Sequence, residues 1–160
     1  MLISFVISTA LSEPSNVISD PISDPYQDVS FVIAASETSY SQAVLKAATL
    51  SEQSGILFNT GGVNFDPTHK ETNGGLTYSK SVCENNGWEY PCYVSRGRWD
   101  EGAYITIEYS SAIQGFTPGL YVVIAASGDR KEVESSFTTV KKLIPDAYMK
   151  TSSVYVGCMH

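Results

Sequence analysis

The chain has 160 residues, enough for one domain that buries a sizeable core without depending on disulfides. Ten Lys and Arg residues stand against seventeen Asp and Glu residues, which gives a formal net charge of −7. This charge would repel nucleic-acid phosphates or an anionic membrane surface, so nucleic acid is not an expected partner. No run approaches the roughly 20 apolar residues that a membrane-spanning helix needs, and we expect no transmembrane segment.

The first 28 residues differ in composition from the rest of the chain. Residues 1–12 form an apolar run with Ala10 and Ser12 placed as a signal peptidase requires, but the run is short and carries no Lys or Arg. It predicts either a signal remnant or an ordinary first strand. Residues 13–28 contain a tandem Ile-Ser-Asp-Pro, and its prolines disfavour a helix. We interpret this segment as an extended linker, unless its isoleucines pack along the domain, and residues 29–160 as a single domain.

Two βα units share the sequence Val-Ile-Ala-Ala-Ser, at residues 32–36 and 123–127. Each copy is rich in β-branched residues and is followed by a helix-capping pair, Ser39 with Gln42 and Asp129 with Glu132. Apolar residues then recur at helical spacing as far as Leu50 in the first unit and Ile144 in the second. Residues 56–59 and 154–156 read as the strands that complete the two units.

This order predicts an α+β fold of the ferredoxin-like split βαβ type (βαββαβ), with a four-stranded antiparallel sheet and both helices on one face. Alternation along the strands divides their residues between the faces. The bulkier set is expected under the helices: Phe31, Ile33, Ala35, Val122, Ile124 and Ala126. The other set is expected on the opposite face: Val32, Ala34, Tyr121, Val123 and Tyr155. That second face is too apolar to be solvated, so the insert at residues 60–118, a partner or a ligand should cover it, and we favour the insert.

The first part of the insert, residues 60–80, is rich in Gly, Thr and Asn and reads as an irregular loop. Asp66, His69 and Glu71 lie close together there, and carboxylates with an imidazole can bind a divalent metal. One His with two acids is a weak pattern for such a site. We therefore expect a solvated loop and no metal.

The second part of the insert carries two cysteines and a predicted β-hairpin. Cys83 and Cys92 enclose eight residues rich in turn formers, so a disulfide between them is expected if the chain is exported. Cys158 is then the odd cysteine, either buried or free. Residues 93–95 and 103–109 predict the two strands of the hairpin.

Catalytic patterns are scarce. The sequence contains no nucleophile elbow, Ser-x-x-Lys, His-Glu-x-x-His or Walker loop, and its histidines are His69 and His160. Asp100 and Glu101 are the best candidates for a hydrolytic carboxylate pair, but we favour the simpler interpretation that they are charges at a hairpin tip. We predict neither enzymatic activity nor a cofactor.

The second βα unit resembles half of a SPOR domain, the sporulation-related repeat of bacterial cell envelopes. The resemblance rests on residues 119–127, on the amphipathic helix after them, and on residues 147–150 leading to 154–157. Residues 31–59 are similar but looser. The insert and the ending Cys158-Met159-His160 depart from the family pattern, as does Ala35-Ser36 in place of the usual Gly-Ser. The resemblance implies a split βαβ fold, an extracytoplasmic location (periplasm, cell surface or secreted) and binding of peptidoglycan glycan strands on the face away from the helices.

The leading hypothesis is therefore a non-catalytic, extracytoplasmic binding module for glycan strands. Aromatic faces stack on sugars, and Arg can bridge hydroxyls or a carboxylate. The candidate ligand-binding residues are Tyr121, Tyr155, Val32, Val123, Arg96 and Arg98, although Tyr121 could equally be core beneath the insert. The first alternative is a structural or protein-interaction subunit of an envelope, filament or virion assembly, joined through an open sheet edge. The second is a small inhibitor or immunity-type protein whose acidic surface suits a basic enzyme.

Overall fold

The computed structural model describes residues 24–98 and 100–157. Our predictions for residues 1–12, for most of the linker and for Cys158 and His160 lie outside this range. Four long strands form the main sheet: β1 (Tyr26–Glu37), β4 (Gly102–Tyr109), β5 (Tyr121–Gly128) and β6 (Tyr148–Tyr155). The helices are α1 (Tyr40–Ser54), α2 (Lys80–Asn85) and α3 (Arg130–Leu143). Two short strands, β2 (Asn64–Phe65) and β3 (Leu76–Thr77), form a second sheet. Single 3-10 turns, η1 (Pro67–His69), η2 (Asn73–Gly75) and η3 (Ser110–Ala112), complete the chain.

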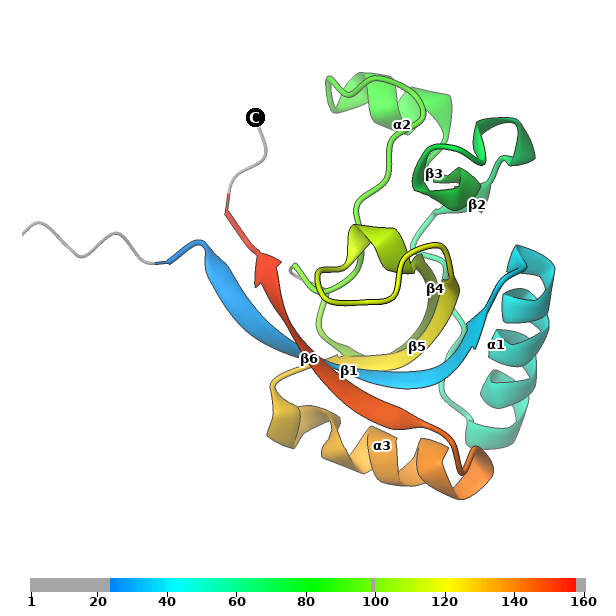
Figure 1. The fold of residues 1–160 in the computed structure, drawn as a ribbon, viewed down its shortest axis with the longest axis vertical. Helices are drawn as coiled ribbons and strands as arrows, with labels where there is room; N and C mark the ends of the chain where they lie inside the picture. Colours follow the sequence, from blue (N-terminus) through cyan, green and yellow to red (C-terminus); the bar gives the residue numbers. More distant parts are fainter. Residues whose placement is uncertain (1–23, 99, 158–160) are drawn as a thin grey trace, which may run out of the picture.

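The prediction of an α+β fold with a four-stranded antiparallel sheet is confirmed. The strand order is β4-β5-β1-β6, and every neighbouring pair is antiparallel (Figure 1). The two copies of Val-Ile-Ala-Ala-Ser lie side by side at its centre, where Ile33 is paired with Ile124. The register shifts twice around this pair, which leaves Ala125 and Ala34 as extra residues.

The two long helices form where their local chemistry predicts. Ser39 is at the N-cap position of α1, but its side chain makes no capping hydrogen bond, so the predicted capping pair with Gln42 is not formed. Gly55, with a φ of 75°, is the C-cap. Asp129 caps α3 by accepting a hydrogen bond from the Lys131 amide at 2.9 Å. Both helices pack on one face of the sheet, since residues from both belong to one apolar core with β1 and β5.

Residues 56–59 do not form the predicted second strand of the sheet. Phe58 makes only an isolated parallel bridge to Ile105, and β4 takes the edge position beside β5. β4 has eight residues and buries both Ile105 and Ile107, whereas Leu57 is exposed to solvent. The longer strand β4, with its buried apolar residues, therefore pairs with β5 in place of residues 56–59. The predicted hairpin partner of β4, residues 93–95, is not a strand either.

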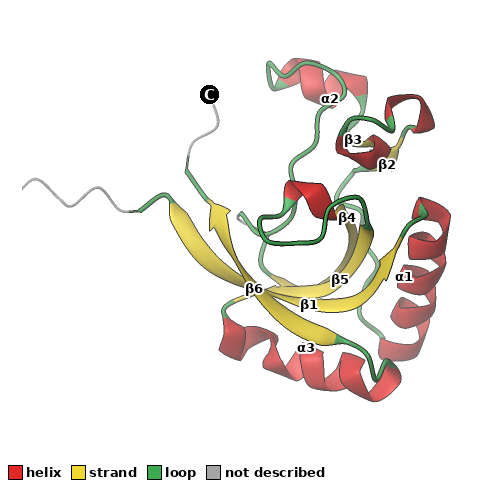
Figure 2. Cartoon of the chain, viewed as in Figure 1, coloured by secondary structure: helices red, strands yellow, loops and turns green. Residues whose placement is uncertain are grey.

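Our assignment of the two sheet faces is wrong for most residues, whereas Ala35 and Ala126 lie with the helical core as predicted. The core beneath the helices contains Val32, Ala34, Tyr121, Val123 and Ala126, and it includes Ala43 and Ala47 of α1. The opposite face carries Phe31, Ile33, Val122 and Ile124, and residues Ile113, Phe116 and Leu120 cover it. Small alanines let the helix approach closely, so bulk is not a guide to the helical face. In Figure 2 the loop after β4 lies on the side of the sheet opposite α3.

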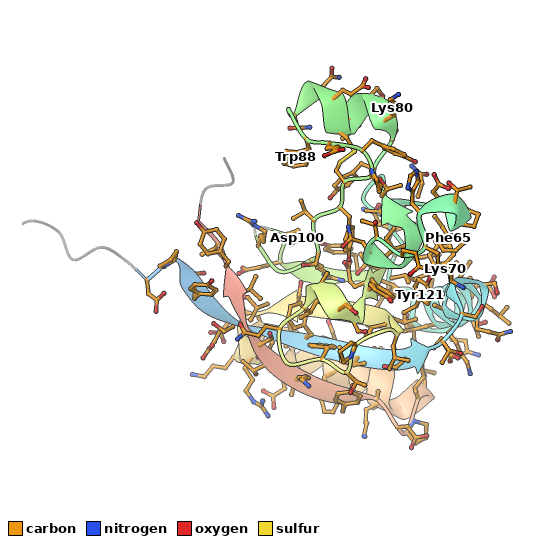
Figure 3. All side chains as sticks on the ribbon, turned by 45° about the horizontal axis from the view of Figure 1, so that its top comes forward. Phe65, Lys70, Lys80, Trp88, Asp100 and Tyr121 are labelled. Carbon is orange, nitrogen blue, oxygen red and sulfur yellow. A yellow bond between two sulfur atoms is a disulfide. The ribbon has the colours of Figure 1, made fainter. Side chains whose placement is uncertain are left out.

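Residues 60–92 form an arm that stands away from the main sheet (Figure 1). The predicted disulfide between Cys83 and Cys92 is formed, and their Cα atoms are 5.8 Å apart. The arm is fastened to the sheet by Tyr121, whose hydroxyl donates to the carbonyl oxygen of Gly74. The rings of Tyr121 and Phe65 lie next to each other at this junction, with centroids 6.2 Å apart (Figure 3).

Candidate functional site

A groove of about 330 Å³ lies where β1 begins and β6 ends. We call it the Tyr26–Tyr155 groove. It lies between the ends of these strands, residues 93–98 and the loop after β4. The residues that line the groove include Tyr26, Ser95, Arg98, Gln114, Ser153 and Tyr155.

Two tyrosines form the aromatic part of the groove. Tyr26 and Tyr155 are directly paired in the β1–β6 register, and their rings meet edge to face with centroids 5.3 Å apart. They keep 50% and 39% of their surface exposed, respectively. An aromatic pair that is held by backbone pairing and remains accessible is suited to stacking on a ligand.

Arg98 provides the positive charge of the groove. Its guanidinium carbon is 5.4 Å from the centre of the Tyr155 ring, and the guanidinium donates to the carbonyl oxygen of Gly157. Gly97 brings the chain to this point with a φ of 111°, and a Cβ there would lie 2.8 Å from the Phe31 ring. A residue without a side chain is therefore required immediately before Arg98.

Arg96 also lines the groove, but its guanidinium is buried and already bonded to the protein. The residue is only 2% exposed. Its nitrogens make five hydrogen bonds, to Ser127 Oγ, Thr106 Oγ1 and the carbonyl oxygens of Tyr104, Ile124 and Gly102, at 2.6–3.3 Å. The group also lies over the Tyr104 ring, 3.6 Å from its centroid. All three guanidinium nitrogens therefore donate to protein oxygens within a buried site, and Arg96 serves the fold.

Glu108 is a buried carboxylate that the sequence analysis missed. It is 5% exposed, and its Oε2 accepts from the Tyr93 hydroxyl and from the Arg96 amide, the latter at 3.2 Å. Burial raises the pKa of Glu108 above its usual value. The only hint in the sequence is the short spacing between Glu108 and the Arg-Gly-Arg segment at residues 96–98.

A second hollow lies on the other side of the segment that carries Val94 and Arg96, since both residues line both hollows. Its volume is about 340 Å³, and we call it the Tyr78–Glu108 cavity. Asp100 lines it and is held by the Gly97 amide at 2.7 Å and by the Tyr104 hydroxyl at 3.0 Å. Burial is the main cause that raises the pKa of Tyr104 to about 12.

Of the six ligand-binding candidates, the structure brings Tyr155, Arg98 and Arg96 together at the groove. The other three lie elsewhere. Val32 and Val123 are fully buried beneath the helices, and Tyr121 is 2% exposed. Our expectation that these three lie on the face away from the helices is therefore wrong, and Tyr121 belongs to the core, which the sequence analysis gave as its alternative. Tyr26, which the sequence analysis assigned to the linker, belongs to β1 and is the groove residue that we did not anticipate.

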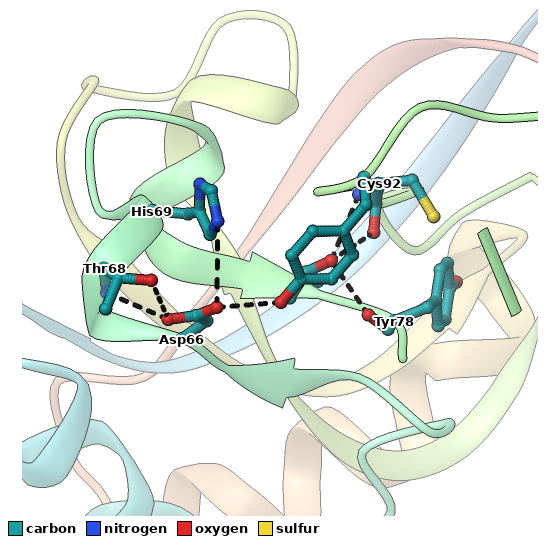
Figure 4. Close-up of polar contacts among 7 residues, drawn as sticks. Asp66, Thr68, His69, Tyr78 and Cys92 are labelled. Carbon is teal, nitrogen blue, oxygen red and sulfur yellow. Dashed lines mark hydrogen bonds and ion pairs between the residues drawn. The ribbon is translucent and has the colours of Figure 1, made fainter. Parts of the chain in front are cut away.

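The Asp66 carboxylate is at the centre of a hydrogen-bonded group in the arm (Figure 4). It accepts hydrogen bonds from the Thr68 amide at 2.9 Å, the Thr68 hydroxyl at 2.6 Å and the Tyr90 hydroxyl at 2.8 Å. The Thr68 and Tyr90 hydroxyls are the main reasons why the pKa of Asp66 falls to about 2. His69 Nε2 is 4.0 Å from Asp66 Oδ2. In the part of the chain that the structure describes, no group of three or more His, Cys, Asp or Glu side chains could hold a metal ion.

Within residues 24–98 and 100–157, no helix is both long and apolar enough to cross a membrane. Comparison of the chain with protein-family models, with curated proteins and with solved structures gives no significant match.

Proposed function

We propose that this protein is a non-catalytic, extracytoplasmic module that binds a glycan strand in the Tyr26–Tyr155 groove, with peptidoglycan as the glycan that the SPOR resemblance implies. The observation that carries the proposal is the accessible tyrosine pair beside Arg98. Each ring retains a large exposed fraction although both residues sit within paired strands. Exposed aromatic pairs of this kind are uncommon unless they bind something.

The chemistry of the groove suits a sugar chain. Aromatic rings offer flat apolar surfaces for the C–H faces of pyranoses, and a guanidinium binds hydroxyl or carboxylate oxygens. Ser95, Gln114 and Ser153 add neutral polar groups along the same groove. The mixture of a few oriented polar groups and an apolar floor is typical of small-ligand sites.

Two further observations support the fold and location in this proposal. The order β4-β5-β1-β6 is compatible with a ferredoxin-like sheet in which β4 takes the place of the predicted second strand. The Cys83–Cys92 disulfide is compatible with an oxidising compartment outside the cytoplasm. The glycan site lies at the strand ends, since residues 113–120 cover the middle of the sheet face.

The test is co-sedimentation of the full chain with intact and with amidase-denuded peptidoglycan. We expect binding to the denuded sacculus that Tyr155→Ala, Tyr26→Ala and Arg98→Ala each weaken. Tyr148→Ala is the matched control, because Tyr148 is similarly exposed at the other end of β6. No binding to either sacculus, or equal loss with Tyr148→Ala, would refute the proposal.

A second candidate function, a protein-interaction subunit, is favoured by one observation. Among the described strands, β6 pairs with β1 alone, so one of its edges is open. An open edge of eight residues can add a strand from another protein. Sedimentation velocity over a range of concentrations tests whether that partner is a second copy, and a monomer throughout would exclude this form of assembly.

A further inference from the structure

The Tyr78–Glu108 cavity has no role in glycan binding at the groove, yet it is lined by two buried charged groups, Arg96 and Glu108, and by the exposed Asp100. The residues that determine its chemistry are Asn59, Tyr78, Arg96, Asp100, Tyr104 and Glu108. They come from three separate parts of the chain. Asn59 follows α1, Tyr78 follows β3 in the arm, and the other residues lie in β4 or in the segment before it. Its volume, about 340 Å³, is at the lower end of the range for small-molecule sites.

The charges in the cavity do not balance. Asp100 and Glu108 bring two carboxylates, and Arg96 brings one guanidinium. The five hydrogen bonds of Arg96 go to protein oxygens, so it cannot clamp an incoming anion. The formal charge of the lining is therefore −1 when both acids are ionised, and the group that would complement it is a monocation.

The lining also has unused hydrogen-bond acceptors. A carboxylate offers about four lone-pair positions. The protein uses three at Glu108, through Tyr93, the Arg96 amide and Thr106, and two at Asp100. Within the described residues, no hydrogen bond reaches the Tyr78 hydroxyl, and no cation lies over the Tyr78 ring. Carboxylate lone pairs and the Tyr78 ring therefore remain as possible partners in the cavity, and a cation with several N–H donors could interact with both.

We propose that the Tyr78–Glu108 cavity binds a small ligand through a primary ammonium group, with Asp100 and Glu108 as acceptors and Tyr78 as the aromatic wall. An ammonium has three N–H donors and one positive charge, which matches the free acceptors and the net charge of the lining. An anionic ligand would face two carboxylates, and a neutral ligand would leave their charge uncompensated. The proposal does not depend on glycan binding at the groove.

Isothermal titration of the full chain with three sugars tests this proposal. Glucosamine carries the ammonium group, N-acetylglucosamine is its neutral counterpart, and glucuronate is an anion of similar size. We expect saturable glucosamine binding in the millimolar range or tighter, and at least tenfold weaker binding of the other two, because about one charge-assisted hydrogen bond separates them. No glucosamine binding, or similar affinities for all three sugars, overturns the proposal.

Amino-acid substitutions test whether glucosamine binds in the Tyr78–Glu108 cavity. Asp100→Asn removes a charge, and Tyr78→Ala removes the aromatic wall, so each should weaken glucosamine binding about tenfold. Tyr78→Phe keeps the ring and the packing, and should lose less affinity than Tyr78→Ala. Tyr148→Ala is the control, because Tyr148 is an exposed tyrosine that lines neither hollow, and it should leave glucosamine binding unchanged. Glucosamine binding that is lost in Tyr148→Ala, or kept in both Asp100→Asn and Tyr78→Ala, places the ligand elsewhere and contradicts the proposal.

Discussion

Tyr121 fastens the arm to the sheet, and its substitution should therefore reduce stability. Its side chain is buried, its hydroxyl donates to the Gly74 carbonyl, and its ring contacts those of Tyr40, Phe65 and Tyr109, with centroids 5.5–6.2 Å away. Tyr121→Phe keeps the ring but leaves the buried carbonyl of Gly74 without this donor, which costs about 1–3 kcal/mol. Tyr121→Ala also removes the ring from the core, which costs about 3–5 kcal/mol.

Urea denaturation followed by near-ultraviolet circular dichroism measures these losses. Tyr121→Phe should lower the midpoint without changing the slope, because the surface exposed on unfolding is unchanged. The folded variant should still bind denuded peptidoglycan, since Tyr121 does not line the groove. A Tyr121→Phe protein that is as stable as the wild type but no longer binds glycan would refute this reasoning and restore Tyr121 as a ligand-binding residue.

Three further predictions concern the arm and the groove. Replacing Cys83 and Cys92 together by Ser should lower the free energy of unfolding by about 2–3 kcal/mol, because the crosslink closes a short loop; an unchanged denaturation midpoint would contradict this. Asp66 has a lowered pKa, so its ionised form stabilises the fold above pH 3.8, and this contribution is lost as the pH falls towards about 2. The stability advantage of the wild type over Asp66→Asn should therefore shrink in acid, and a constant difference across the pH series would disprove it. Gly97→Ala should destabilise the chain and weaken glycan binding, because a Cβ at this φ of 111° meets the Phe31 ring; binding and stability equal to wild type would show that the loop adapts.

The elements that follow from local chemistry were predictable from the sequence. The repeated Val-Ile-Ala-Ala-Ser forms neighbouring strands, and the N-cap positions Ser39 and Asp129 mark where the two long helices begin. The choice of sheet face was not predictable, because both faces are buried and alternation only separates two sets of residues. The extra residues Ala34 and Ala125 further disturb the alternation at the centre of the sheet.

The site depends on contacts between distant parts of the chain, and local patterns do not contain them. Arg96 and Arg98 are two positions apart in the same Arg-Gly-Arg segment, yet one is enclosed by Ser127, Gly102 and their neighbours while the other lines the groove beside Tyr155. Nothing in the local sequence distinguishes a buried arginine from a ligand-binding arginine in this segment. Their roles separate only when β4 and β5 place acceptors around Arg96, and this pairing was itself mispredicted.

Binding of the Tyr155→Ala and Tyr148→Ala variants to amidase-denuded peptidoglycan, with wild type alongside, tests the central claim most directly. Both substitutions remove a half-exposed tyrosine from β6, so their general effects on the surface should be similar. Tyr155 stacking is worth about 1 kcal/mol or more, so we expect at least about fivefold weaker binding for Tyr155→Ala and wild-type binding for Tyr148→Ala. Equal binding by both folded variants would show that the groove does not bind the glycan.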